Sequence, residues 1–271
     1  MTDRNLSLGQ MGARRFGRVN WLGTRTLAER EIRRFLNVWT QTLMAPMITA
    51  GLFLLVFNLA VGPRRGDVMG MPFMVFITPG VLMMTVIQNA FANTSSSILV
   101  AKVQGNIVDT LMPPLSAAEM VLGYVAGAVV RGLIVAVCIA IVGLGYFGVW
   151  PAHPLWALMF VVLGGALMGG LGIIAGTFAN KFDQMAAITN FIVTPLAFLS
   201  GTFYSVSDLP RVMYVLSHAN PFFYLIDGVR YGVLGISDSS PWLGLGVCLA
   251  TTALILGVCW WWFRTGYRIK A

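Results

Sequence analysis

Charged residues are scarce in this sequence. Of its 271 residues, only 10% are Asp, Glu, Lys or Arg, whereas 57% are hydrophobic. Soluble domains average about 25% charged residues. So few charges cannot cover the surface of a water-soluble protein of this length. Much of the surface is therefore expected to face lipid.

Motifs for nucleotide binding, hydrolysis and metal binding are missing as well. The dipeptide Gly-Lys does not occur, which excludes the phosphate-binding loop G-x-x-x-x-G-K-[ST] from this chain. H-E-x-x-H and G-x-S-x-G are also absent. Cys138, Cys248 and Cys259 lie in apolar runs without suitably spaced partners. We therefore expect buried thiols rather than a disulfide or a metal site.

Positive charge is concentrated ahead of the first apolar run. The net charge is +8, and eight of the eighteen Lys and Arg residues precede that run. A basic excess often indicates nucleic-acid binding. Lys and Arg that flank apolar runs are instead typical of the cytoplasmic side of membrane proteins. We therefore expect contacts with membrane lipids and none with nucleic acid. The first twenty residues lack the apolar core of a signal peptide.

Six apolar segments are long enough to cross a bilayer, which takes about 20 residues in a helix. They are residues 40–62, a run from Pro72 towards Lys102, a run from Ser116, a run from the 150–154 break to Asn180, 184–203 and 241–262. Ser116 and Glu119 predict a capping box at the third segment. Pro241 suits the first turn of the sixth. The sequence thus predicts an all-α integral membrane protein with six transmembrane helices.

The distribution of Lys and Arg predicts the orientation of these helices. Thirteen of the eighteen lie on the side of both termini, and four, including Arg64 and Arg65, lie on the other side. Positive residues are enriched in cytoplasmic loops. We therefore expect a multi-pass membrane protein with both termini in the cytoplasm. The predicted organisation is a polar tail at 1–23, an amphipathic helix at 24–39, a six-helix domain at 40–263 and a basic tail at 264–271.

The amphipathic helix precedes the first span. Ala28, Ile32, Phe35, Leu36 and Trp39 share one face, and arginines lie elsewhere around the helix. Such a helix lies in the plane of the membrane interface. It is either an inert anchor or a contact for a cytoplasmic partner.

The loop between the second and third spans carries apolar residues on the expected cytoplasmic side. Asn106 can cap a short helix, with Asp109 in a capping-box-like position. The apolar residues are Ile107, Val108, Leu111 and Met112. Exposed apolar side chains of this kind mark a docking surface. The alternative is that the loop packs against its own bundle.

Polar side chains recur at helical spacing inside two spans. They are Thr85, Gln88, Asn89, Asn93 and Ser96 in the second span and Asn190 and Thr194 in the fifth. Polar groups within hydrocarbon face a bundle interior or a wet cavity, so they either line a path or join helices.

Arg131 lies well inside the third span, where an unpaired charge is costly. It either has a structural partner, such as backbone carbonyls or a residue of the outer segment, or it contacts substrate.

The segment between the fifth and sixth spans is expected on the outer side. Residues 207–210 can open one short helix, and Asn220 a second, PFFYLIDGVRYGVLG. The second is apolar but too short to cross the membrane, which favours a re-entrant hairpin. Asp227 and Arg230 are spaced to form an ion pair.

Four segments together resemble the ABC-2-type transporter permeases. They are EIRRFLNVWTQTLMAPMITAGLF, FITPGVLMMTVIQNAFANTSSSI, NIVDTLMPPLSAAEMVLGYVAGAVVRG and NFIVTPLAFLSGTFYSVSDLP with the following SHANPFFYLIDGVRYGVLG. The likeness covers residues 25–265 in unbroken order. It is closest to the YadH-type inner-membrane permeases, and nodulation-factor and polysaccharide export permeases are more distantly similar.

The resemblance implies a homodimer bound to two copies of an ABC ATPase subunit. ATP and Mg²⁺ would then bind to the ATPase, and this chain would hold no cofactor. It implies that 24–39 is a connecting helix and 105–112 a coupling helix. The residues implied for ATPase coupling are Asn106, Ile107, Val108, Asp109, Leu111, Met112, Arg30 and Arg33. Those for the substrate path are Thr85, Gln88, Asn89, Asn93, Asn190, Thr194 and Phe198. Those for an outer gate are Phe222, Phe223, Tyr224, Asp227 and Arg230.

The leading hypothesis is a non-enzymatic permease subunit of an ATP-driven exporter that moves an amphipathic substrate, such as a lipid, glycolipid, polysaccharide or drug. One alternative is an ion-coupled secondary transporter, which the lack of mid-span carboxylates disfavours. Another is a membrane-embedded lipid-modifying enzyme, for which no pair of nucleophile and base is evident.

Overall fold

The computed structural model describes residues 19–62 and 66–268. Regular structure in this part of the chain is helical, apart from an isolated bridge between Val68 and Met71. Most of the expected polar tail, 1–18, with its four arginines, lies outside the described residues, and so do three further basic residues of the charge count, Arg64, Arg65 and Lys270.

Five helices are long and apolar enough to cross a membrane. The first begins with a π-helical turn, Thr40–Met44, that continues into α2. The helices are α2 (Ala45–Ala60), α3 (Phe73–Val103), α5 (Ala117–Phe147), α6 (Pro154–Phe178) and α11 (Pro241–Thr265). The capping box of Ser116 and Glu119 is confirmed at α5, and Pro241 occupies the first turn of α11.

The predicted fifth span is a shorter helical segment in three pieces. They are α7 (Phe182–Ile188), a π-helical turn (Thr189–Val193) and α8 (Thr194–Phe198), of seven, five and five residues. The segment nevertheless joins the two ends of the bundle. Asn180, before it, accepts a bond from Lys102 near the end of α3. Thr202, after it, lies against Gly80 near the start of α3, where an added Cβ would be 2.5 Å from the Thr202 carbonyl oxygen.

Both π-helical turns precede a proline in the first turn of the next helix. Proline has no amide hydrogen, and its ring collides with the carbonyl four residues earlier in a regular α-helix. A local change to wider hydrogen bonding removes this conflict without ending the helix. Both prolines are visible in the sequence, but uninterrupted helices were predicted for the first and fifth spans.

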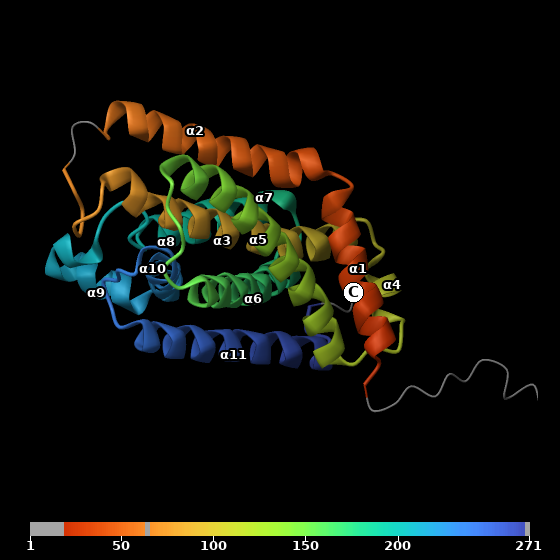
Figure 1. Ribbon diagram of the computed structural model, residues 1–271. Coiled ribbons are helices and arrows are strands. Elements are labelled where there is room, and N and C mark those ends of the chain that lie inside the picture. Colours follow the sequence, from red (N-terminus) through yellow and green to blue (C-terminus); the bar gives the residue numbers. More distant parts are fainter. Residues whose placement is uncertain (1–18, 63–65, 269–271) are drawn as a thin grey trace, which may run out of the picture.

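The helices α3, α5 and α6 form the centre of the bundle, and Figure 1 shows α2 and α11 on opposite sides of it. In the most apolar window of each helix, 78% of α3 is buried but only 11% of the first span and 22% of α11. Glycines let α6 approach α3 closely, because a Cβ on Gly172 would lie 2.1 Å from Thr94 Oγ1. Helix α3 is therefore the inner element around which the others pack.

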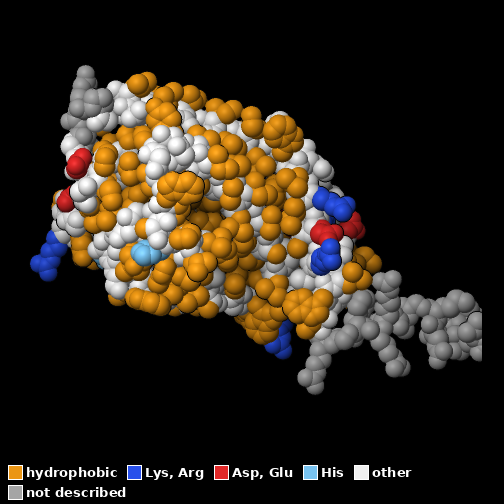
Figure 2. Space-filling view, viewed as in Figure 1, with side chains coloured by type: hydrophobic (Ala, Val, Ile, Leu, Met, Phe, Trp, Pro, Cys, Tyr) orange, Lys and Arg blue, Asp and Glu red, His pale blue; other side chains and the backbone are white. Residues whose placement is uncertain are grey.

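One further helix crosses the end of this bundle. Helix α1 (Trp21–Leu36) lies there together with the short α4 (Ile107–Leu111) and the C-terminal end of the described chain. Figure 2 shows a broad apolar surface between two ends that carry the charged side chains visible from this side. This distribution matches a protein whose middle faces hydrocarbon.

The opposite end holds α9 (Arg211–Ala219) and α10 (Pro221–Leu234) (Figure 1). Asn220 caps α10, since its Oδ1 accepts from the Phe222 amide at 3.0 Å, as predicted. The first outer helix differs from the prediction. Residues 206–208 form only a 3₁₀ turn, and α9 begins after Pro210, whose ring fixes an extended backbone there.

Candidate functional site

Helix α1 starts and ends three residues earlier than the sequence predicted. Asn20 caps it, with its Oδ1 2.9 Å from the Gly23 amide nitrogen. Its buried face consists of Leu27, Glu31 and Phe35, one turn apart. Two residues of the predicted apolar face are exposed: Leu36, at 40%, lies off the buried stripe, and Trp39, at 52%, lies beyond the end of the helix.

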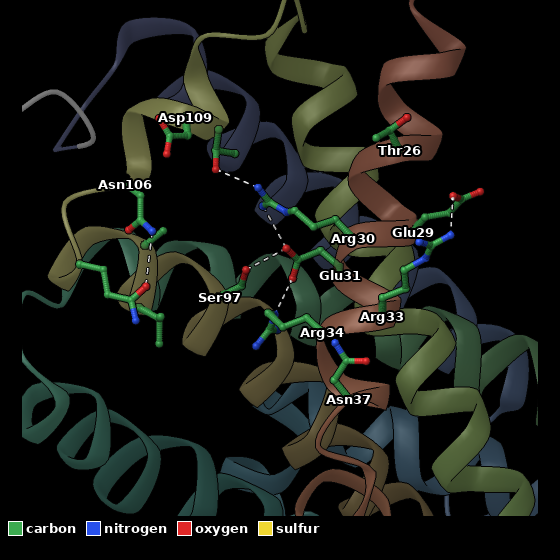
Figure 3. A pocket seen from close by; sticks show the side chains of 14 residues that line it. Thr26, Glu29, Arg30, Glu31, Arg33, Arg34, Asn37, Ser97, Asn106 and Asp109 are labelled. Atoms are coloured by element: carbon green, nitrogen blue, oxygen red, sulfur yellow. Dashed lines mark hydrogen bonds and ion pairs between the residues drawn. The ribbon is translucent and has the colours of Figure 1, made fainter.

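Glu31 is a fully buried carboxylate on this face. Its Oε1 accepts from Arg30 at 3.0 Å and from Ser97 of α3 at 2.9 Å, and its Oε2 accepts from Arg34 at 3.2 Å. Figure 3 shows these side chains converging on the carboxylate from α1 and α3. A buried charge requires such partners. The sequence analysis missed Glu31, although its spacing of four residues from both Leu27 and Phe35 placed it on the apolar face.

Arg30 connects this carboxylate to two further helices. Its Nη1 donates to Thr110 of α4 at 3.0 Å, and its Nη2 lies 3.3 Å from the Tyr124 hydroxyl of α5. Burial lowers the pKa of Arg30, but the oxygens of Tyr124 and Glu31 outweigh it and raise the pKa above its usual value. Arg33, the other arginine predicted for coupling, is exposed and 3.9 Å from Glu29 on its own helix.

Arg34 continues the network into α3. Its Nη2 donates to the backbone oxygen of Asn93 at 2.6 Å and to its side-chain oxygen at 3.2 Å, and its Nη1 donates to Ser96 at 3.2 Å. The guanidinium groups of Arg30 and Arg34 therefore bind α1 to α3, α4 and α5 around one carboxylate. We call Arg30, Glu31, Arg34, Asn93, Ser97 and Thr110 the α1 network. Beside it, a cleft of about 650 Å³ separates α1 from the end of α3 and α4 (Figure 3).

Helix α4 has one face on the bundle and one in solvent. Ile107 and Leu111 pack against the apolar cluster around Leu27 and Tyr124. Val108 and Met112 are 53% and 77% exposed. The predicted apolar docking residues thus divide into a half-buried pair, Ile107 and Leu111, and an exposed pair, Val108 and Met112. Asp109 is also exposed.

The prediction that the Asn106 side chain caps α4 is wrong. The side chain of Asn106 makes no bond to the first turn, and its Nδ2 lies 3.5 Å from Gln104 Oε1. Gly105, with φ +77°, turns the chain just before the helix, so Asn106 takes a backbone conformation that does not aim its side chain at the free amides.

A second cavity, of about 450 Å³, lies between the first span, α3 and α8. Four of the predicted path residues line it: Thr85, Gln88, Asn89 and Phe198. The other three do not: Asn93 belongs to the α1 network, Asn190 is exposed, and Thr194 is half-buried. The sequence analysis missed the contribution of the first span, which supplies Gln41, Thr49 and Phe53. We call this space the central cavity.

Arg131 reaches the central cavity through Asn89. Its Nη2 donates to Asn89 Oδ1 at 2.8 Å, and Asn89 Nδ2 donates to the Thr85 carbonyl at 3.0 Å. The hydrogen-bonding partner is thus on α3, and neither a backbone carbonyl nor an outer residue has this role. The ring of Phe35 lies 6.0 Å from the guanidinium. Asn89 is therefore the lining residue to which the Arg131 guanidinium is hydrogen-bonded.

Four aromatic rings gather at the end of the central cavity away from α1. Phe203 lies 5.1 Å from Phe53, 6.1 Å from Phe57 and 5.6 Å from Phe198, measured between ring centroids. Phe53 and Phe57 are stacked at 4.3 Å. These rings come from α2, α8 and the loop that follows α8. We call them the phenylalanine cluster.

The residues predicted for the outer gate lie elsewhere. Phe222, Phe223 and Tyr224 are buried in the apolar core and do not line the central cavity. The predicted ion pair is confirmed, with 3.6 Å between Arg230 Nη1 and Asp227 Oδ1. Arg230 also pairs with Asp238 at 3.3 Å, which the sequence analysis missed, and its Nη2 donates to the Gly201 carbonyl. Arg230 thus holds the loop that carries Phe203, two residues from Gly201.

Within the described residues, no cluster of three or more His, Cys, Asp and Glu side chains has an arrangement that could hold a metal ion. The three cysteines are free thiols, and Cys248 and Cys259 are buried, as expected, whereas Cys138 is half-buried.

Comparison with known proteins identifies the family of this chain. The family model "ABC-2 type transporter" matches residues 23–234. The chain is 37% identical over 252 residues to "Inner membrane transport permease YadH" of Escherichia coli, covering 93% of this chain and 98% of that protein. It is 28% identical to "Nodulation protein J" of Sinorhizobium fredii, covering 83% and 85% of the two chains. The chain therefore belongs to the ABC-2 type transporter family and is a membrane permease of an ABC transporter.

Proposed function

We propose that this chain is the membrane subunit of an ATP-driven exporter, in which a homodimer binds two copies of a separate ABC ATPase. The observation that carries this proposal is the exposed pair Val108 and Met112 on α4, next to the α1 network. Apolar side chains exposed at a charged end of a membrane protein are suited to docking a soluble partner. ATP and Mg²⁺ would bind to that partner.

The proposed topology is six crossings of the bacterial inner membrane with both termini in the cytoplasm. Residues 182–198 join opposite ends of the bundle, and about 17 residues is the lower limit for a crossing helix. An even number of crossings is also consistent with the placement of α1 and the C-terminal end at one end in Figure 1. Helices α9 and α10 would then form a hairpin on the outer side that does not cross.

The proposed coupling runs from α4 to the central cavity. Movement of α4 on ATP binding would act on Arg30 through Thr110, and then on Arg34 and Asn93 through Glu31. Asn93 is one turn along α3 from Asn89, which lines the cavity. Charged hydrogen bonds keep their partners together during small movements better than apolar contacts do. The α1 network therefore suits a mechanical link between the partner and the path.

The proposed path is the central cavity, completed by a second copy of the chain along the poorly buried first span and residues 182–198. The phenylalanine cluster, held by Arg230 through Gly201, would close it on the outer side. An ion-coupled carrier is less well supported because its carboxylates would belong in the path. Glu31 lies on α1, outside the lining of the central cavity, and is paired with Arg30 and Arg34. A lipid-modifying enzyme would need a nucleophile and a base in the cavity. The lining offers the hydroxyls of Thr49 and Thr85, which donate to their own helices, and among the described residues it has no His, Asp, Glu or Lys to act as the base.

Co-purification with the ABC ATPase tests the proposal. Val108→Asp with Met112→Asp is expected to abolish recovery of the ATPase, identified by mass spectrometry, because two charges would be placed in an apolar contact. Val215→Asp on α9 is the matched control, since Val215 is 58% exposed at the opposite end. Equal recovery of the ATPase with both variants would show that Val108 and Met112 do not form the docking surface. Failure of the unaltered chain to bind any ABC ATPase would remove the proposal itself.

A further inference from the structure

We infer that the central cavity binds an uncharged amphiphile, a molecule with a neutral hydrogen-bonding head and an apolar tail. This inference rests on the proposed role of the cavity as the substrate path, and it concerns the chemistry that the cavity selects. Its evidence is the lack of charge in the lining, two unpaired amides, and the separation of polar from aromatic residues along the first span.

The lining of the central cavity contains no Asp, Glu, Lys or Arg among the described residues. An ion that entered would lose water without gaining a counter-charge, which is unfavourable in a low-dielectric site. Arg131 is not among the lining residues, and it meets the wall of the cavity through a hydrogen bond of 2.8 Å to the side-chain oxygen of Asn89. A neutral molecule does not have this cost.

Two glutamines supply unused hydrogen-bonding capacity. The side-chain amides of Gln41 and Gln88 line the cavity and have no hydrogen-bonding partner among the described residues. Each amide can donate two bonds and accept two. By contrast, Thr49 and Thr85 donate their hydroxyl hydrogens to their own helices, at 2.9 and 2.8 Å. The cavity therefore offers both donors and acceptors to a neutral polar head, such as a sugar or an amide.

The polar and apolar groups are separated along the cavity. Gln41 and Phe53 are twelve residues apart in the first span, so about three helical turns lie between them. The phenylalanine cluster and its neighbours Val81 and Met84 give the other part an apolar surface. The volume of about 450 Å³ falls within the usual range for small-molecule sites. This arrangement matches a molecule that is polar at one end and apolar at the other.

Protection of an engineered cysteine tests the inference without the ATPase. The purified full chain with Thr49→Cys and Cys138→Ala is placed in lipid nanodiscs, and its labelling by N-ethylmaleimide is timed. The probes share a ten-carbon tail: decyl maltoside is neutral, decyl sulfate is anionic and decyltrimethylammonium is cationic. Decyl maltoside is expected to slow labelling by about tenfold and the charged probes by less than about twofold. Leu59→Cys, on the same helix and 71% exposed outside the cavity, is the control and should be unaffected.

A positive charge introduced into the wall of the cavity should change its preference from the neutral probe to the anionic one. Gln88→Lys is expected to transfer protection from decyl maltoside to decyl sulfate, because the ammonium removes a neutral hydrogen-bonding site and supplies a counter-charge. Equal or stronger protection of the unaltered cavity by a charged probe, or no protection by any probe, would overturn the inference. Either result would leave ATPase binding untouched, whereas loss of ATPase binding alone would leave the selectivity for neutral probes intact.

Discussion

At the scale of single residues, Glu31 is the carboxylate around which the α1 network is built. It is fully buried, and the arginines that hold it are 47% and 35% exposed. Glu29, one position away from Arg30 on the same helix, also has two arginine partners, Arg25 and Arg33, but all of these groups are in contact with solvent. The two carboxylates therefore have similar partners and very different surroundings.

This contrast predicts different costs of neutralisation. Glu31→Gln is expected to lower the free energy of unfolding by about 2 kcal/mol, below the loss for a fully buried pair because both arginines retain some water. Glu29→Gln should cost at most about 0.5 kcal/mol, as is usual for exposed ion pairs. Chemical unfolding of the two variants in detergent measures the difference. Equal losses would mean that the burial of Glu31 has no energetic importance.

At the scale of elements, the loop after α8 is held in an unusual conformation. Gly201 has φ +72°, and an added Cβ would lie 2.8 Å from Val206 Cγ2. Its carbonyl accepts a bond from the buried Arg230. This single turn positions Phe203 in the phenylalanine cluster.

Gly201→Ala is therefore expected to destabilise the protein by about 1–2 kcal/mol, the usual cost of a left-handed backbone for a residue with a Cβ. Amide hydrogen exchange of residues 200–206 should become faster because the strained turn opens more often. The control is Gly145→Ala, at a helical position with nothing within 4 Å of the new methyl group, where no loss is expected. Unchanged exchange at 200–206 would contradict the role of this turn.

The sequence was sufficient to predict most of the long elements, because hydrophobic length, proline and capping signals are local. It did not predict α1 correctly at either end, since Asn20 was overlooked as a cap and the apolar pattern was extended past Leu36. Glu31 was missed because only apolar residues were assigned to the buried face. The pairing of Arg131 with Asn89, and of Arg230 with Asp238 and Gly201, depends on tertiary contacts between distant segments. No periodicity in the sequence contains that information.

At the scale of the whole molecule, the charged ends and the apolar middle predict which residues water reaches on each side. Arg25→Cys on α1 and Arg211→Cys on α9 lie at opposite ends. In intact spheroplasts, a membrane-impermeant maleimide is expected to label the cysteine at 211 at once and the one at 25 only after the membrane is permeabilised. Labelling of both from one side would contradict the proposed number of crossings.

The π-helical turn at Thr40–Met44 has a mechanical consequence. It joins α1, which is bound firmly by the Glu31 carboxylate, to a span that is only lightly packed on the bundle. Such a bend would let the two helices act as a lever, in which a small rotation at the bend moves the far end of the first span. The 21 residues of that span measure about 32 Å at 1.5 Å per residue, so a tilt of about 5° at the bend would swing its far tip sideways by about 3 Å. A displacement of this size would be enough to widen or narrow the passage beside it.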